Sequence, residues 1–171
     1  MKNVHPVLVD AWQFECCGEP FAIGDEVRWL LSFTTDLRGP PEARTALSGT
    51  ILDQATSDDG TAGSFMSIGS STVWVLPPLP AGRISVTGFL AEDHHGFVPD
   101  ALSAVHARVT RVRARSLEYR RNGRTLVPVA GSEQLRDVGG FQEWRRGHAH
   151  GAAPGALRDE TGFVVDLDLW I

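Results

Sequence analysis

Two pairs of adjacent residues carry side chains that are suited to bind a metal ion. Cys16 and Cys17 are neighbours, His94 and His95 are neighbours further along the chain, and each pair is followed by a glycine. Thiolates and imidazoles are common zinc ligands, and a closed zinc site needs four ligands. The four residues are therefore candidate ligands of a zinc site, although the sequence as a whole gives no reason to expect a cofactor.

Two other interpretations of the cysteines remain open. Standard zinc motifs place about two to four residues between paired ligands, and neighbouring residues of an extended chain point to opposite faces. Free cysteine is among the most buried residue types, so both thiols can be structural. A cysteine beside a histidine base can also act as a nucleophile, although no complete catalytic motif surrounds either residue.

A second candidate site is cationic. Residues 104–124 contain seven arginines and one glutamate, which gives a local charge of +6 in a chain with a net charge of −5. Arg111, Arg113 and Arg115 alternate along this run, so a strand would present all three on one face. If these arginines are exposed together and unpaired, they form a face that binds an anionic ligand or a nucleic acid. The alternative is a solvated strand whose arginines pair with carboxylates.

Carboxylates occur beside the histidines and near the end of the chain. Glu92 and Asp93 directly precede the histidine pair, and such a cluster can bind a metal or transfer protons. Asp166 and Asp168 alternate with apolar residues, which fits the outward face of an edge strand.

Alternation of apolar and polar residues predicts most of the secondary structure. We expect strands at 7–14, 27–33, 72–76, 83–91, 104–121, 125–129 and 163–171, and a weak strand at 46–52. Short helices are expected at 132–138 and 141–146. The fold class is therefore mainly β. We predict one domain over 1–171, a small antiparallel barrel with an SH3-like or OB-like core and a long irregular insertion at about 35–71.

Three local features of these strands make sharper predictions. The run 104–121 changes its apolar face twice, so bulges are expected near Thr110–Arg111 and near Arg115–Ser116. The alternative is a break into two strands. Asn122-Gly123 favours a tight hairpin turn that joins 117–119 to 125–129. Gly88 inside a strand indicates a bend or the close approach of another backbone.

Composition excludes several classes of protein. The net charge of −5 argues against a protein built wholly around nucleic acid. No apolar run approaches the roughly 20 residues that a membrane span needs. The apolar stretch at the N-terminus is too short for a signal peptide. We therefore expect a cytoplasmic protein with reduced thiols and no membrane partner.

The block from Trp12 to Trp29 reads Trp-x-x-x-Cys-Cys-Gly-x-Pro-Phe-x-x-Gly-x-x-Val-x-Trp. It resembles the opening of a family of small actinobacterial proteins that is known as a domain of unknown function, and 92–96 and 162–169 are similar to its later parts. The resemblance implies a soluble bacterial protein and carries no activity or catalytic residue. The sequence thus predicts a non-enzymatic binding or interaction module. The alternative is a metal-binding protein with a Cys/His site, with or without catalytic activity.

Overall fold

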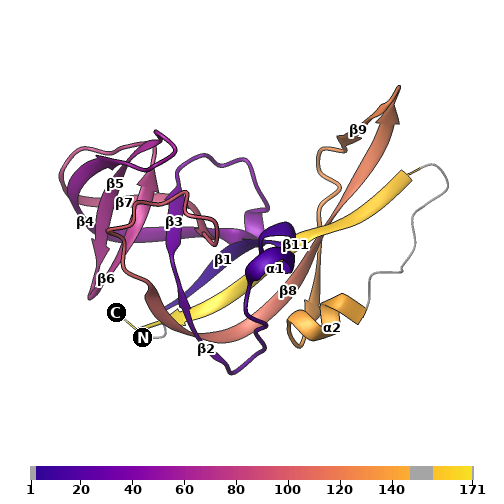
Figure 1. Cartoon of the computed structure of the whole chain (residues 1–171), viewed down its shortest axis with the longest axis horizontal. Coiled ribbons are helices and arrows are strands. Elements are labelled where there is room, and N and C mark those ends of the chain that lie inside the picture. Colours follow the sequence, from indigo (N-terminus) through magenta and orange to yellow (C-terminus); the bar gives the residue numbers. More distant parts are fainter. Residues whose placement is uncertain (1–2, 147–155, 171) are drawn as a thin grey trace.

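The computed structural model shows a mainly β protein. It describes residues 3–146 and 156–170, and the side chains of these residues except 15–17, 144–146 and 156–157. Strands make up 62% of the structure and helices 7%, with a closed five-stranded barrel and two short helices. The expected fold class is confirmed. Figure 1 shows the barrel at one end of the molecule and a long, twisted ribbon of strands leading away from it.

The barrel closes on itself. Its strands are β3 (Leu31–Thr34), β4 (Arg44–Thr56), β5 (Ala62–Ile68), β6 (Ser71–Leu76) and β7 (Gly82–Glu92). Pairing runs from β7 through β3, β6, β5 and β4 and returns to β7, so the ring has no free edge. Within this ring, β3 and β6 are the one parallel pair. Followed from β4, the ring β4–β5–β6–β3–β7 has the strand order of an OB barrel whose last strand comes first along the chain, which favours the OB-like alternative.

The segment 35–71 is not the irregular insertion that its proline and glycine content suggested. It contains the short 3₁₀ helix η1 (Pro41–Ala43) and two barrel strands, β4 and β5. Leu47, Ile51 and Met66 from these strands are at most 2% exposed inside the barrel. The outward positions are largely small or polar, because that face of the barrel is solvated, and this hid the alternation in the sequence.

A second group of strands forms the ribbon. β1 (Val4–Asp10) pairs with the end of β7 and with β11 (Ala156–Leu169), and β11 pairs along its length with β8 (Val105–Asn122). The other edge of β8 carries, in order, β2 (Glu26–Trp29), β10 (Gln134–Val138) and β9 (Thr125–Pro128). Since β11 lies between β8 and β1, the strand that carries Asp166 is central and not the expected edge strand.

Two expected strands end early. β1 stops at Asp10 and is followed by α1 (Ala11–Cys17). The buried apolar residues there, Ala11 and Phe14, are three residues apart, which is helical spacing. The run 27–33 breaks at Leu30, where the chain leaves the ribbon for the barrel.

The two expected helices have different outcomes. The segment 132–138 forms no helix, because 134–138 is the strand β10, whose residues pair with β8 from Val112 to Ser116. The helix expected at 141–146 is present as α2 (Phe141–Arg146).

The two bulges and the hairpin that were predicted for β8 are present close to the expected residues. Thr110 is the extra residue of one bulge between β8 and β11. The second irregularity lies opposite Arg115 and Ser116, although its extra residue, Thr161, belongs to β11. The expected hairpin is also present, with Tyr119 opposite Pro128. Its turn lies one residue later than expected.

That turn consists of Gly123 and Arg124, between the paired residues Asn122 and Thr125. Gly123 has a φ of 61°, the left-handed region that glycine adopts without strain. Gly88 is explained by proximity: a Cβ atom at this position would lie 2.0 Å from the Thr34 carbonyl oxygen. Another backbone does therefore approach this strand closely, as the glycine indicated.

The main core joins the ribbon to the barrel. Rings from α1, α2, two strands and the loop before β2 pack together at centroid distances of 5.1 to 6.4 Å. They belong to Phe14, Phe21, Trp29, Phe141 and Phe163. The same buried cluster continues into the barrel through Leu31, Phe33 and Val75. Of the helices that the structure describes, none is long and apolar enough to cross a membrane.

Candidate functional site

The three arginines expected to form an open face are all ion-paired. Arg111 binds Asp137 through two contacts, with Nε 2.6 Å from Oδ1 and Nη2 3.0 Å from Oδ2. Arg113 pairs with Asp166, and Arg115 pairs with Glu133. The three side chains do not form an exposed, unpaired face; they are paired with carboxylates, as the second interpretation of the sequence has it.

The topology explains this pairing. The middle of β8 lies between β10 and β11, so carboxylates from both neighbours reach its side chains: Asp137 comes from β10, and Asp166 comes from β11. Arg113 is only 7% exposed. The Arg111 guanidinium holds the pKa of Asp137 below its usual value. The pairs of Arg111 and Arg113 thus link β8 to β10 and to β11.

Beyond its partners β10 and β2, the same strand continues into an exposed hairpin. We call residues 119–128 the arm; it comprises the end of β8, the turn and β9. Every residue from Arg120 to Pro128 is exposed, and Figure 1 shows this hairpin projecting away from the body of the protein. Arg120, Arg121 and Arg124 lie on the arm, and no ion pair is found for any of them within the described structure.

The arginines of the arm are distributed over both of its faces. Arg120 is opposite Val127 and Arg121 is opposite Leu126, and successive residues of a strand point to opposite sides. Arg124 lies in the turn. Leu126 and Val127 are 46% and 44% exposed, so each face presents an arginine next to an apolar side chain.

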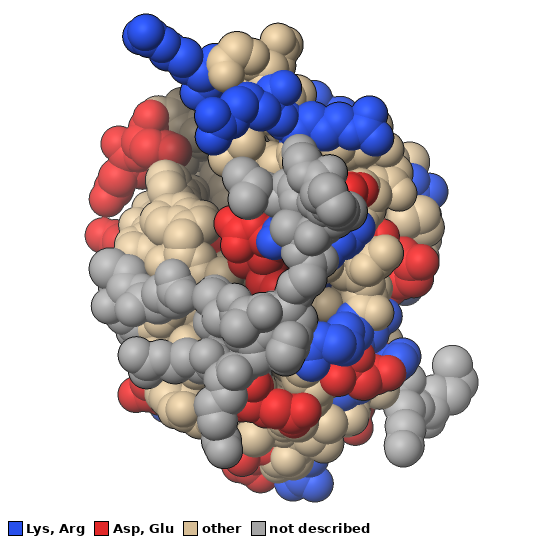
Figure 2. All heavy atoms as spheres, turned by 90° about the vertical axis from the view of Figure 1, so that its right-hand side faces the viewer, with Lys and Arg blue, Asp and Glu red and all other residues tan. Residues whose placement is uncertain are grey.

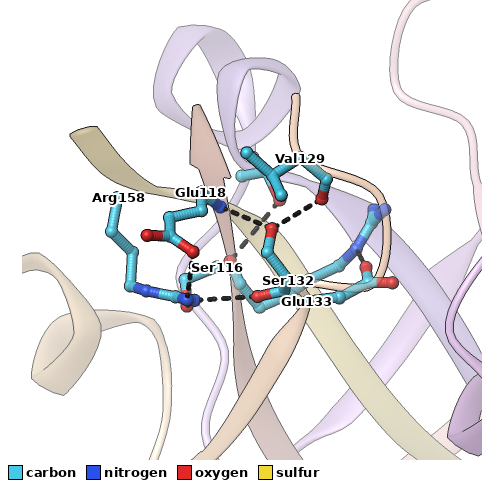
Figure 3. A network of polar contacts seen from close by, with 8 residues as sticks. Ser116, Glu118, Val129, Ser132, Glu133 and Arg158 are labelled. Atoms are coloured by element: carbon cyan, nitrogen blue, oxygen red, sulfur yellow. Dashed lines mark hydrogen bonds and ion pairs between the residues drawn. The ribbon is translucent and has the colours of Figure 1, made fainter. Parts of the chain in front are cut away.

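A network of polar contacts holds the base of the arm (Figure 3). The Ser132 hydroxyl accepts a hydrogen bond from the Glu118 amide at 2.9 Å and donates one to the Val129 carbonyl at 2.7 Å. Arg158 of β11 donates from Nη1 to Ser116 Oγ and to the Ser132 carbonyl, both at 3.1 Å. The chain leaving the arm is thereby fastened to β8 and β11, which fixes the direction in which the arm points.

Figure 2 shows the charge on this side of the molecule. Blue Lys and Arg side chains gather at the top, where the arm lies, and red Asp and Glu side chains are frequent below. The net charge of the chain is −5, so the chain without the three arm arginines carries −8. The arm is a local cationic surface on an acidic protein.

The cysteine and histidine segments lie side by side. The sequence suggested a loop for both pairs. The cysteines instead occupy the last two positions of the helix α1, whereas the histidines do follow β7 in a loop. Gln13 Oε1 of α1 accepts a hydrogen bond from the His94 amide at 3.1 Å. The ring of Phe14 lies 5.4 Å from the ring of His94.

Glu92 and His94 form a partly buried pair. His94 Nδ1 lies 2.8 Å from Glu92 Oε1, and the Glu92 side chain is only 1% exposed. The second oxygen of this carboxylate, Oε2, is buried without a hydrogen-bond partner. Burial raises the pKa of Glu92, while His94 acts in the opposite direction. The spacing Glu-x-His at the end of a strand puts both side chains on one face, which is the sequence signal for this pair.

His95 has a different environment. Its ring stacks on the exposed ring of Trp12 at a centroid distance of 4.9 Å and an interplanar angle of 5°. Among the side chains that the structure describes, no three metal-binding groups come together. The side chains of Cys16 and Cys17 lie outside that description, so the four-residue zinc site stays a prediction.

The structure as a whole defines a small β-barrel protein with an appended ribbon that ends in a cationic arm. A model of a family of unknown function, DUF6578, matches residues 3–169. The chain belongs to this family. No curated protein and no solved structure matches the chain.

Proposed function

We propose that this protein is a non-enzymatic binding module of the bacterial cytosol, and that the arm is the surface by which it holds an anionic partner. The observation that carries the proposal is a contrast between two groups of arginines. The central arginines of β8 are all ion-paired, whereas those of the arm have no carboxylate partner among the described residues. Exposed guanidinium groups bind phosphate or carboxylate through paired hydrogen bonds.

Charge and rigidity support the choice of this surface. The acidic body repels an anionic partner, so contact is favoured only where the cationic arm extends beyond that body. The network around Ser132 holds the base of the arm, which reduces the conformational entropy lost on binding. Leu126 and Val127 add exposed apolar contact beside the arginines.

Binding of a short, labelled DNA duplex tests the proposal with a defined polyanion. We expect binding that weakens as salt rises, because neutralised phosphates release counterions. Replacing Arg120, Arg121 and Arg124 with Ser should reduce the slope of log affinity against log salt by about 0.9 per lost phosphate contact, or about 2.7 in all. Fluorescence anisotropy over a salt series measures both quantities.

A charge-matched variant provides the control. Arg38, Arg44 and Arg83 are exposed residues of the barrel region, and replacing them with Ser removes the same charge. This control should bind the duplex almost as the unchanged protein does. Equal losses in the two triple variants would show that binding follows net charge alone, and the arm would then not be a specific surface.

A further inference from the structure

The arm carries positive charge on both of its faces. Residues that are directly opposite in an antiparallel pair lie on the same face. Arg120 therefore shares one face with Val127, and Arg121 shares the other face with Leu126. A flat anionic surface, such as an acidic patch on another protein, would contact only one of these faces. The arrangement fits a partner that presents negative charge on both sides of the arm.

The major groove of a DNA duplex presents negative charge in this way, because a phosphate backbone lines each of its two sides. The groove is about 12 Å wide and admits a two-stranded β-ribbon, whereas the minor groove is only about 6 Å wide. Stacked sheets lie about 10 Å apart, which is the thickness of a ribbon with side chains on both faces. The arm therefore matches the width of the major groove and not that of the minor groove.

The length of the arm matches the depth of the same groove. The strand β11 begins at Ala156, opposite Arg120, so the arm is only two strands wide beyond this residue. Arg121 and Arg120 precede the turn residue Gly123 by two and three residues, which is roughly 7 and 10 Å along a strand. The major groove is about 8.5 Å deep. With the tip at the floor of the groove, both guanidinium groups lie near the level of the phosphates.

The tip carries side chains that suit the edges of bases. Asn122, Arg124 and Thr125 lie at or beside the turn and are exposed. In the major groove, arginine binds guanine and asparagine binds adenine through paired hydrogen bonds, and threonine contacts either base. The segment 119–128 contains no Asp or Glu that would repel a phosphate. The tip is thus equipped for bases, and the arginines behind it for the backbone.

We infer, on the basis of the proposed function, that the partner of the arm is double-stranded DNA and that the arm enters its major groove tip first. Arg120 and Arg121 bind phosphates of opposite strands, while Asn122 and Arg124 reach the bases. The hairpin projects from the body of the protein (Figure 1), so the acidic body stays outside the groove.

Duplexes that differ in their grooves test this inference with the unchanged protein. Fluorescence anisotropy compares a labelled DNA duplex with one whose cytosines carry a glucosylated 5-hydroxymethyl group, which fills the major groove. Loss of even one good base contact should weaken binding about 10-fold. An RNA duplex of the same sequence should also bind more weakly, because its major groove is too narrow for side chains. Netropsin, which fills the minor groove, should leave the affinity for DNA unchanged.

Two single substitutions test the contact on both sides of the arm. Arg120→Ser and Arg121→Ser should each reduce the slope of log affinity against log salt by about 0.9, because each removes one phosphate contact. Arg83→Ser, at an exposed position of the barrel, is the charge-matched control and should leave the slope unchanged. A reduction in only one of the two arm variants would indicate a one-sided partner, such as an acidic protein, and would overturn the inference.

The remaining outcomes separate this inference from the proposed function. Equal, arm-dependent binding of the plain DNA, the glucosylated DNA, the RNA duplex and heparin would overturn the groove and leave the arm as a general surface for anions. Loss of DNA binding on addition of netropsin would overturn the choice of groove. Absence of arm-dependent binding to all four polyanions would overturn the inference and count against the proposed function as well.

Discussion

Removing residues 163–171 should leave a chain that does not fold. β11 is the central strand of the ribbon, between β8 and β1. Five apolar side chains at most 4% exposed would be lost: Phe163, Val164, Val165, Leu167 and Leu169. Burial of such side chains contributes about 1.5–3 kcal/mol each, so the loss matches the roughly 5–15 kcal/mol stability of a typical domain.

Circular dichroism and thermal unfolding of the truncated chain measure this effect. A chain that ends at Leu169 is the control, because Trp170 is 44% exposed and its removal leaves the ribbon strands complete. The control should melt close to the full chain. A chain without 163–171 that stays soluble and melts at the same temperature would show that the core lies elsewhere.

Replacing Arg113 with Ala should destabilise the protein strongly. Arg113 is 7% exposed, and its removal leaves the Asp166 carboxylate, whose side chain is 19% exposed, without its cation. Breaking a buried ion pair in this way costs about 3–5 kcal/mol. Arg111→Ala is the matched control on the same strand. Its pair with Asp137 is largely exposed and contributes little to stability.

Urea unfolding of the two variants gives the free energies of unfolding directly. Stability should fall in the order unchanged protein, Arg111→Ala, Arg113→Ala. Equal effects of the two substitutions would mean that burial does not distinguish these ion pairs.

Strands with strict alternation could be predicted from the sequence, and others could not. The phase changes in β8 located both irregularities, because a change of apolar face requires an extra residue in one of the two paired strands. The strand β5 is not predicted, and β4 is predicted only as a weak strand at 46–52, since the outward residues of both strands are small and polar. The helix α1 was read as strand, because over so few residues helical and alternating patterns share most of their apolar positions.

The candidate sites show a similar limit. The number and alternation of the arginines on β8 were visible in the sequence, but their partners come from β10 and β11, which only the topology brings alongside. For this reason the three central arginines were taken as the binding face instead of the three on the arm. The meeting of α1 with the histidine loop could not be predicted either, because Gln13 and His94 are 81 residues apart.

The central claim is that the arginines in the middle of β8 stabilise the fold, whereas the arginines of the arm bind the partner. Its most direct test compares two charge-matched variants. The inner variant replaces Arg111, Arg113 and Arg115 with Ser, and the outer variant replaces Arg120, Arg121 and Arg124 with Ser. Stability and binding of the labelled duplex are measured for both.

The inner variant should unfold at clearly lower urea, because it leaves three carboxylates without their cations. The outer variant should unfold like the unchanged protein and lose the salt-dependent binding. An outer variant that still binds, or an inner variant that is fully stable and does not bind, would contradict this division of the strand.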